Sequence, residues 1–102
     1  MKVRWNRQSK EQLRQTAQYI YLEFGQKARD KFMQAVRQTN DLLADNPYLG
    51  PLEVILADLP SKYRSIVVRH LNKIVYRIVE THIEVVAFWD CRREPQKLAQ
   101  NL

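Results

Sequence analysis

The chain has 102 residues, 45% of them hydrophobic and 27% charged, which fits a single domain over residues 1–102 and excludes two independent cores. Seventeen Lys and Arg residues against eleven Asp and Glu residues give a net charge of +6. This excess slightly favours a polyanion or an acidic protein as partner over a merely solvated surface. No apolar run approaches the roughly 20 residues that cross a bilayer or resembles a signal peptide. The lone Cys91 fits a reducing compartment, so we expect a cytoplasmic protein.

The first half of the chain predicts a short strand and two helices. Residues 2–5 alternate basic and apolar side chains, as a strand does. Ser9 stands three residues before Gln12, the spacing of a capping box, so we expect a helix to begin there and to end at Gly25. A second helix follows at once and ends before Pro47, because the residue preceding a proline is pushed out of the helical region. Since the connection is short, the helices should form a hairpin.

The last third of the chain changes to the two-residue period of strands. Residues 62–69, 72–79 and 82–90 are rich in Val, Ile and Tyr, and short turns separate them, which predicts an antiparallel meander. One more helical turn is expected at residues 95–102. The order β-α-α-β-β-β predicts an α+β domain in which a four-stranded antiparallel sheet carries a two-helix hairpin on one face. The predicted core residues are Leu13, Ile20, Phe24, Phe32, Val36, Leu43, Tyr76 and Val85.

The alternation also divides the strand residues between the two faces of the sheet. The residues expected to meet the hairpin are Ile66, Val68, Ile74, Tyr76, Ile78, Ile83, Val85 and Ala87. On the opposite face, Val75, Val79 and Phe88 interleave with Lys73 and Arg77. Exposed apolar side chains beside cations indicate a surface that a partner partly covers.

Signatures of familiar catalytic sites do not occur in the sequence. There is no glycine-rich phosphate loop, no GxSxG, no HExxH and no CxxC pair. One cysteine with the isolated His70 and His82 is too small a set for a zinc site, so we expect no metal and no cofactor. Both histidines are interpreted as ordinary exposed residues, because a catalytic role requires a reacting proton within reach.

Four cations lie near the ends of the predicted strands: Arg64, Lys73, Arg92 and Arg93. If the sheet twists and the tail folds back, they frame a basic depression that holds a phosphate or a partner's carboxylates through forked contacts. The alternative, solvated charges that discourage sheet aggregation, is supported at least as well by the spacing. Arg77 carries the same charge on a strand and is not assigned to this site.

The second half of the chain carries an ordered set of recognisable segments. The run YRSIVVRHLNKIVYRIVETHIEVVAFWDCRREP resembles the strand meander of toxins of the RelE/ParE superfamily. DNPYLG resembles the segment that ends the second helix in that family, and FWDCRREPQKL resembles the Arg-x-x-Pro tail of plasmid stabilisation proteins. The resemblance covers nearly the whole chain, and its more specific segments lie in residues 45–98. It implies the toxin of a bacterial type II toxin–antitoxin system.

The resemblance leaves two mechanisms open. RelE-like members cleave messenger RNA on the ribosome, and Arg64, Lys73 and Arg93 stand at positions resembling three of their basic residues. The aromatic or His that such members often carry near the C-terminus is missing, because only EPQKLAQNL follows Arg93. A group placed to assist proton transfer is therefore absent. ParE-like members poison DNA gyrase and lack the nuclease residues, so the chain is placed nearer to them.

The resemblance also implies an antitoxin partner whose tail wraps the toxin. Val75, Val79 and Phe88, beside basic residues, offer a groove for an acidic amphipathic tail that orders on binding. A degenerate toxin that only binds an antitoxin-like regulator is a third alternative, and a homodimer is left open.

Overall fold

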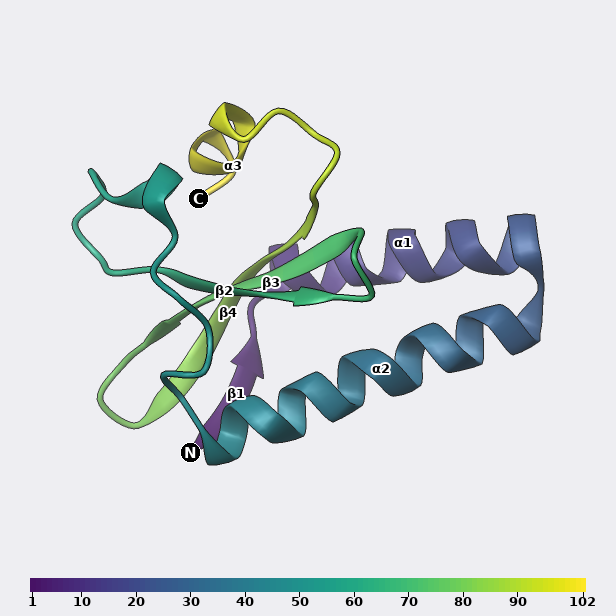
Figure 1. Cartoon of the computed structure of the whole chain (residues 1–102), viewed down its shortest axis with the longest axis horizontal. Helices are drawn as coiled ribbons and strands as arrows, with labels where there is room; N and C mark the ends of the chain where they lie inside the picture. The colour runs from purple at the N-terminus through teal and green to yellow at the C-terminus, as the bar shows by residue number, and fades with distance from the viewer.

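One four-stranded sheet lies between a helical hairpin and two short segments that cover its other face (Figure 1). The computed structural model describes all residues from Met1 to Leu102. The elements follow the predicted order: β1 (Lys2–Trp5), α1 (Arg7–Phe24), α2 (Gln26–Asp45), a 3₁₀ turn η1 (Val54–Leu56), β2 (Arg64–Val68), β3 (Asn72–Ile78), β4 (His82–Asp90) and α3 (Gln96–Gln100). The closed end of the hairpin projects past the sheet (Figure 1).

The sheet is mixed, so the prediction of a fully antiparallel sheet is wrong for one strand. Its order is β1-β4-β3-β2, and the pairs β2–β3 and β3–β4 are antiparallel as expected. β1 instead pairs in parallel with β4, from Lys2 opposite His82 to Trp5 opposite Val85. An alternating pattern identifies the side chains that share a face, and it carries no information on strand direction. Because β2 and β4 are both antiparallel to β3, β1 also runs in the same direction as β2, and the hairpin with the irregular segment that joins β1 to β2 is long enough for such a crossover.

The start of α1 differs from the predicted capping box. The N-cap residue is Asn6, whose side-chain oxygen accepts a hydrogen bond from the backbone N–H of Ser9 at 2.8 Å. Ser9 is fully buried, and its hydroxyl donates to the carbonyl of Val85 at 3.1 Å. The side chain of Gln12 accepts a hydrogen bond from the backbone N–H of Phe88 at 2.8 Å. The two residues expected to cap the helix therefore attach it to β4.

A β-bulge in β4 changes which residues face the hairpin. Tyr76 of β3 pairs with Val85, and the preceding residue of β3 pairs with Ala87, which leaves Val86 as an extra residue. Beyond the bulge the alternation shifts by one position, so Phe88 turns toward the hairpin and Ala87 turns away from it. The prediction had Phe88 on the face away from the hairpin and Ala87 on the hairpin side. Both placements are wrong, because a strict two-residue period cannot include an inserted residue.

The hairpin and the sheet enclose the larger core. It contains the predicted residues Phe32, Val36, Leu43, Tyr76 and Val85, all buried, with Leu13 and Ile20 partly buried against them. Phe88 completes this core against two aromatic rings, those of Trp5 and Phe32, at 5.9 Å each. The prediction for Phe24 is wrong: its side chain is 69% exposed, because the end of the hairpin extends beyond the sheet.

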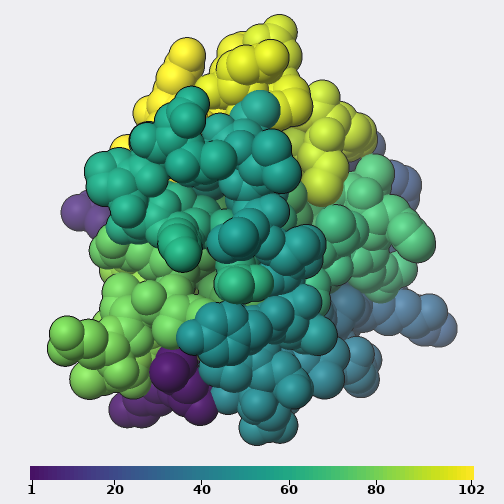
Figure 2. Space-filling view, turned by 60° about the vertical axis from the view of Figure 1, so that its left-hand side comes forward, coloured from purple at the N-terminus to yellow at the C-terminus, as the bar shows by residue number.

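The chain itself covers the second face of the sheet. The buried residues of this second core are Leu56, Val75, Val86, Ala87, Trp89 and Leu98. Leu56 belongs to η1 and Leu98 to α3, and the two segments lie side by side on the surface (Figure 2). The small helix predicted at the C-terminus therefore closes a face that was expected to be open.

The hydroxyl of Tyr76 fixes the segment that leads from α2 to the sheet through two hydrogen bonds, which together are called the lock below. The hydroxyl of Tyr76 accepts a hydrogen bond from the N–H of Gly50 at 2.9 Å and donates to the carbonyl of Pro47 at 2.8 Å. A side chain at Gly50 would collide with the carbonyl oxygen of Ser65, so only glycine fits there. This lock holds the segment against the strand that starts at Arg64.

Replacing Tyr76 by Phe should lower the free energy of unfolding by about 1–3 kcal/mol, because the buried N–H of Gly50 would lose its acceptor. The measurement is urea unfolding followed by circular dichroism. The matched control is Tyr63→Phe, since Tyr63 is only half-buried and takes no part in the lock, and its effect should stay within about 0.5 kcal/mol. Equal effects of the two changes would show that the lock contributes nothing.

Candidate functional site

The four cations predicted to share a site lie in three different settings. Lys73 lies on the covered face of the sheet, Arg92 and Arg93 lie in the tail, and Arg64 lies at the start of β2. Each has its own partner within the chain. The structure therefore does not bring the four together as one basic depression.

Lys73 is neutralised by an acidic residue from the segment before β2. Its ammonium group lies 2.7 Å from a carboxylate oxygen of Glu53, and the two side chains are only 18% and 13% exposed. The hydroxyl of Ser65 donates to the same oxygen at 2.6 Å. Burial alone would raise the pKa of Glu53, but the hydrogen bonds from Lys73 and Ser65 outweigh it and hold the pKa below its ordinary value. At neutral pH the carboxylate of Glu53 therefore neutralises the charge of Lys73.

The two tail arginines hold the chain after β4. Arg92 makes two side-chain hydrogen bonds to Asp90, at 3.0 and 2.9 Å, and these lower the pKa of the Asp90 carboxyl. The guanidinium of Arg93 lies over the ring of Trp89 at 4.3 Å, a cation–π contact. Both side chains remain exposed. They position the tail and still present charge at the surface.

Arg64 lies beside cations that were not expected to join it. Its guanidinium lies over the ring of Tyr48 at 4.9 Å and donates to the carbonyl of Gly50 at 2.9 Å. Lys62 and Arg77 line the same pocket of about 370 Å³. Arg77 had been left out of the predicted site. The alternation gave no signal for it, because the partner of Arg64 is Tyr76, and the next residue of β3 belongs to the other face of the sheet.

The apolar groove predicted on the second face is not open. Val75 is completely buried beneath η1 and α3, and Phe88 is 3% exposed on the hairpin side. Both were expected to be exposed, and the self-covering tail and the bulge are the reasons that they are not. Val79 is half-buried and lines the pocket that contains Arg64.

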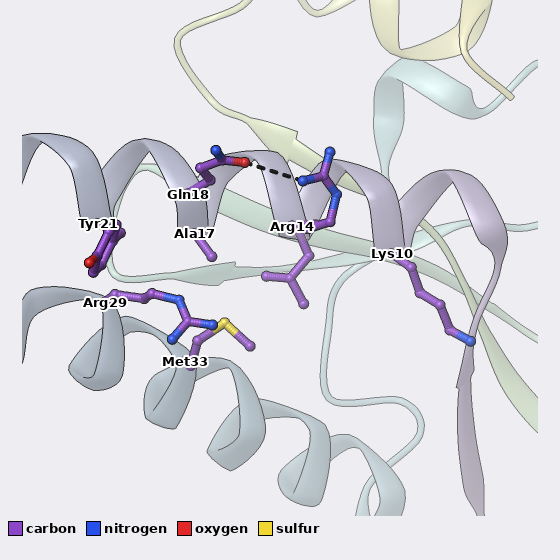
Figure 3. A pocket seen from close by; sticks show the side chains of 8 residues that line it. Lys10, Arg14, Ala17, Gln18, Tyr21, Arg29 and Met33 are labelled. Atoms are coloured by element: carbon purple, nitrogen blue, oxygen red, sulfur yellow. Dashed lines mark hydrogen bonds between the residues drawn. The ribbon is translucent and has the colours of Figure 1, made fainter. Parts of the chain in front are cut away.

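The hairpin provides a different groove, of about 580 Å³, between its two helices (Figure 3). Apolar side chains from both helices line it: Leu13, Ala17, Tyr21 and Met33. Gln18 and three cations, Lys10, Arg14 and Arg29, complete the lining, and Figure 3 shows the side chain of Arg29 lying between the two helices beside Met33. Arg14 is paired with Glu11 at 2.6 Å, whereas Lys10 makes no ion pair and the closest acidic contact of Arg29 is 3.9 Å away. The groove is apolar and positively charged.

A second hollow of about 520 Å³ lies between the hairpin and the turn that joins β2 to β3. Its apolar lining includes Phe24 and Leu71, both substantially exposed. Its cations are Lys27, Lys31 and Arg69. The exposed Phe24 thus belongs to a surface of the same character as the groove between the helices.

Side chains that commonly hold metal ions do not gather anywhere in this structure. No group of three or more His, Cys, Asp or Glu residues is close enough to hold a metal ion. None of the helices combines the length and the apolar composition that a membrane span requires.

Comparison with known proteins gives one family and one fold. A family model described as the ParE toxin of the type II toxin-antitoxin system, parDE, matches residues 3–95. A solved structure described as the chromosomal ParDE TA system from P. aeruginosa is similar with a TM-score of 0.72, covering 88% of this chain and 95% of that chain. The sequence identity is 14%, so this likeness concerns the fold alone. No curated protein matches the sequence.

Replacing Glu53 by Ala should lower the free energy of unfolding by about 1–3 kcal/mol at neutral pH, because Lys73 would keep its charge in a poorly hydrated place. The double variant Glu53→Ala/Lys73→Met should recover part of the loss. A depressed pKa means that the stabilisation is present above the ordinary pKa of glutamate, about 4.3, and is lost as the pH falls through the folded value. Urea unfolding of the unchanged protein and of Glu53→Ala across the acidic range tests this. A difference in their free energies of unfolding that stays constant on acidification would contradict it.

Proposed function

Because the chain belongs to the ParE toxin family of type II toxin–antitoxin systems, we propose that it arrests growth by inhibiting DNA gyrase in the cytoplasm and that a cognate antitoxin neutralises it. The observation that carries the choice of gyrase over messenger RNA is the ion pair between Lys73 and Glu53. Inhibition then proceeds by binding, without any bond being cleaved by this chain.

A ribonuclease of the related RelE type needs unneutralised cations beside the scissile phosphate and a group that accepts a proton. Among the three positions that resemble its basic residues, Lys73 is already paired with a carboxylate. The sheet face on which Lys73 lies is covered by Leu56 and Leu98. These contacts favour a protein-binding toxin over a nuclease.

The groove between α1 and α2 is the proposed site for the antitoxin. Its apolar lining fits the apolar face of an amphipathic segment, and Lys10 and Arg29 fit acidic side chains beside that face. This location replaces the one predicted on the sheet at Val75 and Phe88, because both of those side chains are buried. The tail arginines Arg92 and Arg93 remain candidates for contact with gyrase, since both lie exposed at the surface.

The purified toxin should abolish supercoiling by DNA gyrase and leave messenger RNA intact on translating ribosomes. Arg93→Ala should weaken the inhibition by about tenfold or more, the effect of losing a charge-assisted contact. Lys97→Ala, which removes a neighbouring exposed cation, should change it little. Cleaved message would support the RelE-like alternative. Inactivity in both assays, with antitoxin binding retained, would support a degenerate toxin.

Charge reversal in the hairpin groove should separate antitoxin binding from toxicity. The variant Lys10→Glu/Arg29→Glu should bind the cognate antitoxin about tenfold or more weakly, because its acidic side chains would face like charges. Calorimetric titration measures this, and growth arrest by the free toxin should persist. The control Lys2→Glu/Lys97→Glu changes the net charge equally on exposed residues outside the groove. Equal weakening by both variants would rule out the groove.

A further inference from the structure

A separate basic pocket lies where β2 begins and β3 ends, and it shares no residue with the groove of the hairpin. Its volume is about 370 Å³. The lining residues are Tyr48, Ser61, Lys62, Arg64, Arg77, Ile78 and Val79. Five of these seven side chains carry hydrogen-bond donors, and none carries a carboxylate.

The charges of this pocket are only partly balanced. Arg77 pairs with Glu84 at 2.8 Å, whereas Lys62 and Arg64 make no ion pair. Three cations against one carboxylate leave two positive charges around a small volume. Cations that line one pocket repel one another, and a bound anion would relieve that repulsion.

The two guanidinium groups are held in place by partners within the chain. Arg64 donates through Nη1 to the carbonyl of Gly50 and lies over the ring of Tyr48. Arg77 donates through Nε to Glu84 and through Nη1 to the hydroxyl of Ser61 at 2.9 Å. A guanidinium has five N–H donors, so each group keeps several for a ligand, and Ser61 keeps its own hydroxyl proton. Two immobilised forks of this kind suit the oxygens of a phosphate.

An aromatic side chain stands beside these donors. Tyr48 carries Arg64 over one face of its ring and is still 71% exposed, so much of this aromatic side chain is open to solvent next to the cations. Proteins that bind single strands combine a cationic track with aromatic rings on which bases stack. We propose that this pocket binds a backbone phosphate of a single-stranded nucleic acid, with a neighbouring base on Tyr48. This contact adds to the proposed action on gyrase and does not depend on it.

Fluorescence anisotropy with a short labelled single-stranded DNA oligonucleotide and the full chain tests the proposal. Binding should weaken as salt increases, because counterions are released from the phosphates. Arg64→Gln should weaken binding by about tenfold or more, and Tyr48→Ala by about fivefold or more. Thermal unfolding checks each variant. Should Arg64→Gln unfold, Lys62→Gln still tests the pocket, because Lys62 makes no ion pair in the chain.

The matched control is Lys2→Gln in β1, because Lys2 is exposed, lines none of the described pockets and removes the same charge as Lys62→Gln. Lys62→Gln should weaken binding several-fold and Lys2→Gln should not. Equal effects would mean a diffuse charge effect and overturn the proposal. A mononucleotide that binds as tightly as the oligonucleotide would overturn it in favour of a free nucleotide. Full competition by polyglutamate, with no effect of Tyr48→Ala, would overturn it in favour of an acidic protein.

Discussion

The attachment of α1 to the bulged strand β4 is the constraint on which the other features depend. β1 pairs with β4 only as far as Val85, so the following backbone groups of β4 have no strand beside them on that side. Buried backbone groups without partners are costly. The carbonyl of Val85 accepts from the backbone N–H of Asn6 and from the hydroxyl of Ser9, and the side chain of Gln12 accepts from the N–H of Phe88. The N-cap residue and two side chains of α1 thereby take the place of a strand beside β4, and they fix the hairpin against the sheet.

The bulge then determines the use of both faces. Phe88 enters the core under the hairpin, and Trp89 turns to the opposite face. On that face the ring of Trp89 makes a cation–π contact with Arg93. This contact directs the tail back across the sheet, and Leu98 of the tail is completely buried there. A face that could have held a substrate is closed by the chain's own C-terminal segment. The surfaces left for partners lie on the hairpin and where β2 begins and β3 ends.

The net charge of +6 becomes informative only when the paired cations are set apart from the unpaired ones. Lys73 and Arg92 each have a carboxylate within 3 Å, so they contribute mainly to the arrangement of the sheet and tail. Lys62 and Arg64 have no such partner and face a pocket. An anionic ligand gains more from the second kind of cation, because no internal ion pair has to be broken first.

Periodicity and breaker residues were sufficient to predict the elements: β1 and β4 have the predicted bounds, and α2 ends before Pro47 as expected. The family resemblance was also readable from the segments after residue 45, and the match over residues 3–95 agrees with it. The direction of β1, the inserted Val86 and the exposure of Phe24 were not predictable in this way. A period describes side chains within one element, whereas these features depend on how one element pairs with or packs against another. For the same reason the pocket that unites Arg64 with Arg77 became visible only once the strands were in register.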